Sequence, residues 1–136
     1  MVQLIVGVKG EGKTKKMLDH VHNVMKSVDG NIVYLDKSFQ NMHELDNKVR
    51  LINVSEYPIQ NTDQFLGFVC GICSQDYDLE EMYLDGFLKI AKLEGQDLSP
   101  ALTQLNKISE QFKVNMVLSI SVNKEDLPEF ARSQVI

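Results

Sequence analysis

Eight residues near the start of the chain, GVKGEGKT at positions 7–14, combine three glycines with a lysine–threonine pair. They match the pattern GxxxxGK(S/T), in which glycines let the backbone fold around an anion so that consecutive N–H groups point at phosphate oxygens. The lysine of this pattern bridges the β- and γ-phosphates of a nucleotide, and the final hydroxyl binds Mg²⁺. The stretch therefore predicts a phosphate-binding loop in which Lys13 and Thr14 have these two roles.

The candidate nucleotide-contacting residues extend over this loop and into the first turn after it. They are Gly7, Lys9, Gly10, Glu11, Gly12, Lys13, Thr14 and Lys15. Together with Lys16, two of these lysines form a local basic patch, although the chain has a net charge of −5. Two interpretations of Lys9 stay open, a second phosphate ligand or a solvated loop lysine.

A nucleotide site of this kind also needs an acidic residue at the end of a nearby strand, because its carboxylate helps to hold the Mg²⁺. The apolar stretch MYLD ends in Asp85. We predict that Asp85 and Thr14 share the metal ion, and that Asp85 and Lys13 belong to the catalytic residues. ATP with Mg²⁺ is the ligand that we expect.

Short apolar runs alternate with amphipathic stretches along the whole chain. The runs predict strands at 2–6, 31–36, 50–54, 80–85 and 115–122. Helices are expected at 12–28 with Gly30 as a left-handed cap, after a cap at Asn61 or Thr62, at 87–93, and from Ser99, with Ser99 as the cap and Pro100 at the first helical position. This alternation predicts one α/β domain over residues 1–136, with a mostly parallel five-stranded sheet between two helical layers. Such an α/β/α sandwich is the fold of the P-loop NTPases.

Five stretches extend the similarity beyond the loop: GVKGEGKTKKM, VRLINVSEY, FLGFVCGI, YLDGFLKI and SISVNKEDLPE. Through them nearly the whole chain resembles a group of very small bacterial P-loop proteins that are loosely compared with the twitching-motility retraction ATPases. The resemblance implies a minimal P-loop fold that binds a nucleotide. The order of the segments also resembles the branch of P-loop NTPases in which an extra strand separates the loop strand from the metal-aspartate strand.

That branch usually has a water-activating glutamate directly after the aspartate, but this chain has Gly86 there. Asp36 and Glu56 end the second and third predicted strands, so either is an alternative base, and we favour Glu56 as the catalytic one. Strand five carries Ser119, Ser121 and Asn123. By analogy with related ATPases, Asn123 is a candidate sensor of the γ-phosphate, and a loop cap is the competing interpretation.

Composition narrows the class of partner. Only Arg50 and Arg132 are arginines, and the net charge is −5, so nucleic acid is not expected to bind. No apolar run is long enough for membrane insertion, and no leader segment is evident, so we expect a cytoplasmic protein. We interpret the Cys70–Cys73 pair as buried small hydrophobic residues within a helix, and His20 and His22 as solvated.

Three functions stay open. The first is a Mg²⁺-dependent NTPase whose hydrolysis is slow or stimulated by a partner, because no arginine finger or glutamate base is evident. The second is a nucleotide-sensing module that does not hydrolyse, and the third is a small nucleoside or metabolite kinase. A protein partner or a homo-oligomer is expected for the first two.

Overall fold

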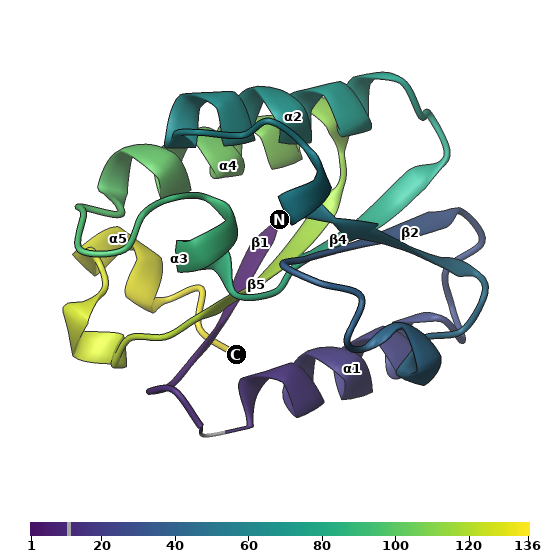
Figure 1. Cartoon of the computed structure of the whole chain (residues 1–136), viewed down its shortest axis with the longest axis horizontal. Helices are drawn as coiled ribbons and strands as arrows, with labels where there is room; N and C mark the ends of the chain where they lie inside the picture. The colour runs from purple at the N-terminus through teal and green to yellow at the C-terminus, as the bar shows by residue number, and fades with distance from the viewer. Residues whose placement is uncertain (11) are drawn as a thin grey trace.

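The five strands form one parallel sheet in the order β1-β5-β4-β2-β3, in a computed structural model that describes residues 1–10 and 12–136 (Figure 1). The strands are β1 (Val2–Val6), β2 (Asn31–Asp36), β3 (Val49–Asn53), β4 (Leu79–Leu84) and β5 (Asn115–Ile120). The predicted α/β fold with a five-stranded sheet is confirmed, and the sheet is parallel throughout. The strand that lies between β1 and β4 is β5, the last one along the chain.

Helix α1 (Lys13–Val24) covers one face of this sheet. Its apolar residues recur at steps of three and four, which places them on one side of the helix. Met17, Leu18 and Val21 are buried there against side chains of all five strands, Ile5, Ile32, Val49, Tyr83 and Val117 among them. Because α1 begins directly after the glycine loop, this packing fixes the position of the loop relative to the sheet.

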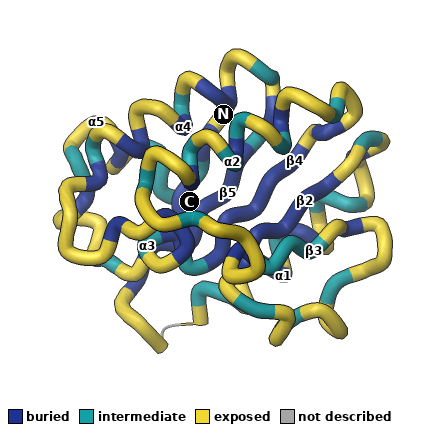
Figure 2. Tube along the Cα trace, turned by 45° about the horizontal axis from the view of Figure 1, so that its top comes forward, coloured by how far each residue is buried: buried dark blue, intermediate teal, exposed yellow. Residues whose placement is uncertain are grey.

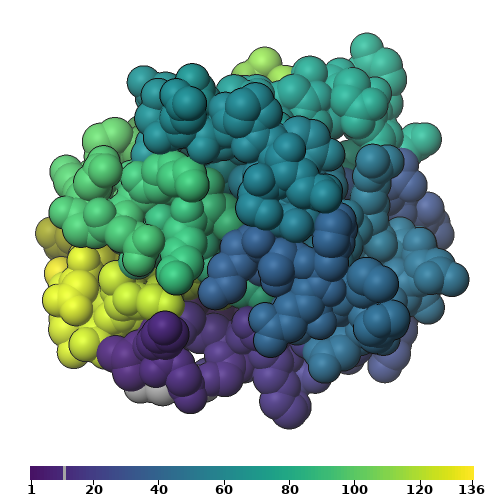
Figure 3. Space-filling model, in the orientation of Figure 1, coloured from purple at the N-terminus to yellow at the C-terminus, as the bar shows by residue number. Residues whose placement is uncertain are grey.

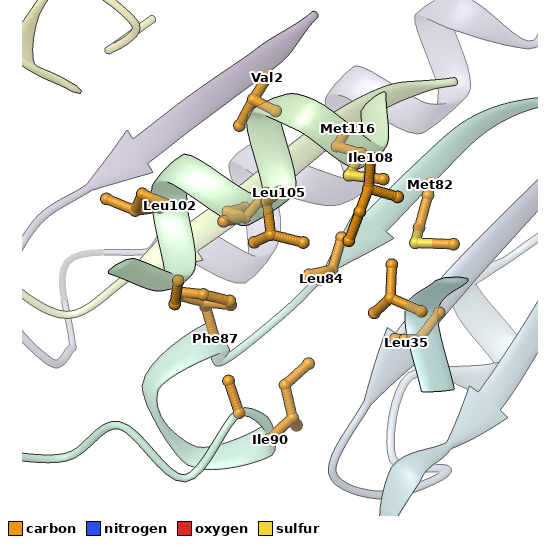
Figure 4. Close-up of a cluster of buried hydrophobic side chains, with 14 of the residues drawn as sticks. Val2, Leu35, Met82, Leu84, Phe87, Ile90, Leu102, Leu105, Ile108 and Met116 are labelled. Carbon is orange, nitrogen blue, oxygen red and sulfur yellow. The ribbon is translucent and has the colours of Figure 1, made fainter. Parts of the chain in front are cut away.

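The other face is covered by α2 (Thr62–Ser74), α3 (Phe87–Ile90) and α4 (Ser99–Phe112). Figure 4 shows Leu105 and Ile108 of α4 beside the sheet residues Leu84 and Met116. Figure 2 shows the consequence for exposure: the central strands are buried along most of their length, whereas the helices are exposed on their outer sides. A sheet covered on both faces explains why the strands are continuous apolar runs and do not alternate with polar residues.

The C-terminal tail protects the outer edge of β1, which is an edge strand. After α5 (Glu129–Arg132), the Leu4 N–H donates to the Gln134 carbonyl at 2.9 Å, and the Ile136 N–H donates to the Leu4 carbonyl at 2.9 Å. This short parallel bridge at Leu4 and Val135 satisfies backbone groups that an edge strand otherwise leaves open. The tail therefore helps to hold the strand that carries the glycine loop.

Three predicted helix boundaries were wrong. The helix predicted at 87–93 ends at Ile90. Helix α1 ends at Val24 and not at residue 28, because tight turns use the Val24 carbonyl, which accepts from the Ser27 N–H at 3.0 Å and from the Val28 N–H at 3.1 Å. Gly30 consequently caps no helix, and its backbone is not left-handed. Instead it lies against the backbone oxygen of Asp78 and the side chain of Glu80.

The start of α4 also differs from the prediction. Ser99 is the first residue of the helix and makes no cap with its side chain. The Asp97 carboxylate accepts the Ser99 N–H at 3.0 Å, and this bond lowers the pKa of Asp97. For α2 the first alternative is confirmed, since Asn61 Oδ1 accepts the Gln64 N–H at 2.9 Å.

The two cysteines both lie in α2. Cys73 is buried and Cys70 is half-buried. Burial, with a smaller effect from Cys70, raises the pKa of the Cys73 thiol to about 11, so this thiol stays protonated at neutral pH, as expected for a packing residue. In the described residues no helix is long and apolar enough to cross a membrane.

Substitution of two glycines tests this packing. Gly30→Ala should lower the free energy of unfolding by about 1–3 kcal/mol, because the added methyl overlaps backbone at Asp78. Gly67→Ala is the matched control: this position is exposed in α2 with nothing within 4 Å of an added Cβ, so it should gain about 0.5–1 kcal/mol. Urea unfolding measures both, and equal effects of the two substitutions would contradict the close approach at Gly30.

Candidate functional site

The glycine loop joins the carboxyl end of β1 to the start of α1. Gly10 and Gly12 have φ angles of 91° and 77°, which are left-handed conformations that favour glycine over other residues. Among the described residues no side chain caps α1, and most of the N–H groups of its first turn have no partner there, so that they could bind an anion. Lys13 Nζ donates to the Val8 carbonyl at 3.1 Å, so the lysine folds back over its own loop.

The other predicted loop residues differ in their placement. Gly7 is buried, and its N–H donates to the Val122 carbonyl at 3.0 Å, which anchors the loop to the end of β5. Lys9 is exposed. Lys15 Nζ pairs with Asp19 at 3.0 Å on the outer side of α1, so its side chain does not turn toward the loop. Glu11 lies outside the described residues.

Asp85 follows β4 and is almost fully buried, with 4% of its surface exposed. Ser119 Oγ donates to its Oδ1 at 2.6 Å, and Tyr34 OH donates to its Oδ2 at 2.7 Å. Thr14 Oγ1 lies 3.4 Å from the same Oδ1. The structure thus brings Thr14 and Asp85, which are far apart in the sequence, to one point at the carboxyl edge of the sheet.

Strand order explains how this cluster forms. Ser119 and Tyr34 belong to β5 and β2, the two strands that flank β4. The Gly86 N–H donates to Ser119 Oγ at 2.7 Å, and the Asp85 N–H donates to the Leu35 carbonyl at 2.9 Å. Each flanking strand therefore holds both the backbone and the carboxylate of the turn after β4.

Gly86 occupies the position at which the resemblance to P-loop NTPases would imply a glutamate, and the backbone conformation there favours glycine. Its φ of 68° is left-handed, which strains any residue with a side chain. An added Cβ at Gly86 would meet nothing within 4 Å, so the backbone angle and not space is what favours glycine. In this turn a glutamate directly after Asp85 is disfavoured.

Tyr34 acts as a donor to Asp85 at any ordinary pH. Burial raises its pKa, and the charge and hydrogen bond of Asp85 raise it further. Its ring stacks on that of Tyr83, with centroids 5.8 Å apart, and Tyr83 OH lies 2.7 Å from His20 Nδ1. Partial burial lowers the pKa of His20, so the prediction of a solvated His20 was wrong, whereas His22 is exposed as predicted.

Of the two alternative bases, the structure brings Asp36 and not Glu56 close to Asp85. Asp36 ends β2 and is buried, where it accepts from the Lys37 N–H at 2.7 Å and from Asn41 Nδ2 at 3.0 Å. Glu56 is exposed after β3, at the sheet edge opposite to β1. With strands about 4.8 Å apart, that edge is roughly 19 Å from the glycine-loop strand.

Of the three polar residues named for the fifth strand, Ser119 and not the candidate sensor Asn123 contacts Asp85. Asn123 is exposed after β5, and its backbone carbonyl accepts the Asp126 N–H at 3.0 Å. Ser121 is exposed as well. Ser119 is the strand residue that contacts Asp85.

The oxygen atoms in this cluster fit a magnesium ion. Mg²⁺ is usually held by one or two carboxylates, a hydroxyl, water and the phosphates of its nucleotide, and not by a cage of protein ligands. Thr14 and Asp85 would supply the hydroxyl and the carboxylate, and Asp85 Oδ2, which accepts only from Tyr34 among the described residues, keeps one lone pair for a metal ion. Among the described residues no group of three or more histidine, cysteine or acidic side chains could hold a metal ion by itself.

Sequence reasoning did not assign a role to Tyr34, and it named Ser119 only as a member of its strand. A tyrosine within the aliphatic run of 31–36, two residues before Asp36, is the one signal that marked Tyr34. Its bond to Asp85 depends on the pairing of β2 with β4, which the sequence does not reveal. Comparison with models of protein families and with curated proteins found no match for this chain.

Removal of one hydroxyl at a time tests the buried cluster. Tyr34→Phe should lower the free energy of unfolding by about 1.5–3 kcal/mol, because a hydrogen bond to a buried carboxylate is lost. Tyr83→Phe is the control, since its hydroxyl meets a neutral, half-buried imidazole, and it should lose only about 0.5–1.5 kcal/mol. Chemical denaturation at pH 7 measures both, and an equal or smaller loss for Tyr34→Phe argues against a charged Asp85 partner.

The carboxyl of Asp36 should respond to Asp85. Burial raises the pKa of Asp36, the Lys37 N–H lowers it, and the charge of Asp85 raises it again. Asp85→Asn should therefore lower the pKa of Asp36. In the wild type, the free energy of unfolding should fall as the pH rises from the ordinary aspartate value to this raised pKa, since the folded chain holds its proton longer.

Carbon-13 NMR titration of the side-chain carboxyls measures the pKa of Asp36 in both chains, and urea unfolding at several pH values measures the change in stability. Glu81 is the internal control, because its pKa is raised by burial without any effect of Asp85. A pKa of Asp36 that stays unchanged in Asp85→Asn would show that the two carboxylates do not interact.

Proposed function

We propose that this protein binds a nucleotide, with ATP preferred, in a Mg²⁺-dependent way, and that it hydrolyses the nucleotide slowly or on stimulation by a partner. The observation that carries the proposal is the approach of Thr14 Oγ1 to Asp85 Oδ1 at 3.4 Å. These are the two side chains that a nucleotide-bound magnesium ion needs from the protein. Their meeting at the end of a glycine loop is what such a site requires.

The loop supports the same function. The phosphates of the nucleotide would accept from the free N–H groups at the start of α1, where the helix dipole also favours negative charge. Lys13 would exchange its bond to the Val8 carbonyl for the β- and γ-phosphates. Bound magnesium would neutralise charge on the phosphates, while Ser119 and Tyr34 keep the Asp85 carboxylate oriented toward Thr14.

Slow hydrolysis follows from what surrounds Asp85. Gly86 offers no base, Glu56 lies at the far edge of the sheet, and the Asp36 carboxylate already accepts two hydrogen bonds. Asp36 is nevertheless the one of the two that lies close enough to Asp85 for the charge of Asp85 to raise its pKa, in addition to the larger effect of burial. An arginine supplied by another subunit raises turnover by about 10³–10⁵ in comparable enzymes, so a protein partner or a second copy is part of the proposal.

The main alternative is a nucleotide-sensing module that binds ATP without useful hydrolysis. The left-handed turn at Gly86 favours it, because this turn disfavours the glutamate that activates water in the related branch. The two functions share the same binding site. They differ only in whether phosphate is released faster than in solution.

Thermal unfolding in the presence of nucleotides tests the binding site. At a ligand concentration of 100 times the dissociation constant, ATP with Mg²⁺ should stabilise the wild type by about 2.7 kcal/mol, which raises its Tm by a few degrees. Lys13→Ala should abolish this shift, and Asp85→Asn should abolish its dependence on Mg²⁺. Each variant is compared with its own unfolding curve without ligand.

Lys15→Ala is the matched control, since this neighbouring lysine pairs with Asp19 and should not contribute to binding. A shift that survives in Lys13→Ala, or the absence of any shift with ATP or GTP, would contradict the proposal. Phosphate release by a chain that binds ATP then separates the alternatives. Turnover no faster than in solution, alone and at high protein concentration, indicates the sensing module.

A further inference from the structure

A hollow lies at the carboxyl edge of the sheet, beyond the ends of β2 and β3. It has a volume of about 250 Å³ and is lined by three lysines, Lys37 directly after β2, Lys89 in α3 and Lys92 just after it. Figure 3 shows these segments meeting at the surface, blue for the connection after β2, teal for the segment after β3 and green for the α3 region. The three lysines come from separate parts of the chain, so the fold and not a basic run in the sequence gathers them.

The charge of this hollow, which we call the lysine pocket, opposes that of the whole protein. The chain has a net charge of −5, yet no acidic side chain of the described residues lines the pocket. Within the described part of the chain, none of the three ammonium groups makes an ion pair or a hydrogen bond. Like charges gathered in one hollow repel each other, and an anion bound between them removes this repulsion.

The remaining lining shows what kind of anion fits. Tyr57 is 42% exposed, and its ring packs on Phe68 with centroids 5.0 Å apart, which holds it as one wall. Ile59 adds an apolar surface, and Ser55 adds a hydroxyl. A pocket of this size accepts a small molecule, with an apolar or flat body against the tyrosine and a charged group between the lysines. Lysine ammonium groups are common ligands of phosphate.

We propose that the lysine pocket binds a small phosphate monoester with an apolar or aromatic body. This site is distinct from the glycine loop: it lies on the β2–β3 side of Asp85, whereas the loop follows β1 at the other end of the sheet. Asp36 and Asp85, which precede Lys37 and α3 in the chain, stand between the two. The proposal does not depend on nucleotide binding, because none of the loop residues that the structure describes lines the pocket.

The backbone conformation at Lys92 allows one of the three charges to be removed without a loss of stability. Its φ of 59° is left-handed, and the turn is held by Thr62 Oγ1 on the Ala91 carbonyl at 2.8 Å and by Gln96 Nε2 on the Lys92 carbonyl at 3.2 Å. Glycine prefers this conformation, so Lys92→Gly removes the ammonium group and should not lower the Tm. Lys113, with a φ of 54° after α4, lies outside the pocket and offers the same substitution as a control.

The test is an NMR titration of backbone amides with phenyl phosphate and with inorganic phosphate, at constant ionic strength. It uses the Lys13→Ala chain, so that the glycine loop does not compete for the probe. Saturable shifts are expected around residues 55–59 and 89–92. The double variant Lys89→Ala/Lys92→Gly should weaken binding by about tenfold for each ammonium removed, whereas the control Lys107→Ala/Lys113→Gly should leave it unchanged.

Tyr57→Ala separates the two sources of phosphate. This substitution should weaken the binding of phenyl phosphate and leave the binding of inorganic phosphate unchanged. Equal weakening of both would show that the pocket recognises only the anion, and would overturn the aromatic part of the proposal. Shifts that do not saturate, or an equal loss in the control double variant, would overturn the site itself. The Tm shift with ATP and Mg²⁺ is measured separately and should be the same in the wild type and in Lys89→Ala/Lys92→Gly. Failure of one proposed site can therefore be told apart from failure of the other.

Discussion

The buried carboxylate of Asp85 is the constraint on which the site depends. A carboxylate that is 4% exposed is costly unless hydrogen bonds compensate it, and Tyr34 and Ser119 supply two of them. Both donors come from the strands that flank β4, so the sheet must keep its order for the charge to be tolerated. The third hydroxyl, that of Thr14, belongs to α1, and the same carboxylate thereby connects the sheet to the helix that follows the glycine loop.

The position of β1 at the edge of the sheet makes this connection vulnerable. Only β5 pairs with β1 along its length, and the C-terminal tail bridges its outer side at Leu4. The first strand, the last strand and the tail therefore support the loop together, and α1 packs over β1 and β5 through Met17 and Val21. A five-stranded sheet can hold the strand before the glycine loop in this way, because distant parts of the chain cover the open edge of that strand.

Charge is divided between the edge and the rest of the molecule. The glycine loop and the lysine pocket both offer positive groups at the carboxyl ends of strands, in a chain whose net charge is −5. Between them stand Asp85 and Asp36, whose carboxylates are close enough for one to raise the pKa of the other. Parallel strands bring all these groups to one edge because their carboxyl ends point the same way.

The sequence by itself determined the strands, most helices, the glycine loop after the first strand and the place of Asp85 at a strand end, because each follows from local patterns of glycine, apolar residues and strand ends. Tertiary structure decided the rest. The partners Tyr34 and Ser119, the short distance from Asp36 to Asp85 and the remote edge of Glu56 all depend on strand order, which brings together residues that no local pattern relates. Gly30 is a similar case, since its constraint is a neighbouring backbone and not the helix before it.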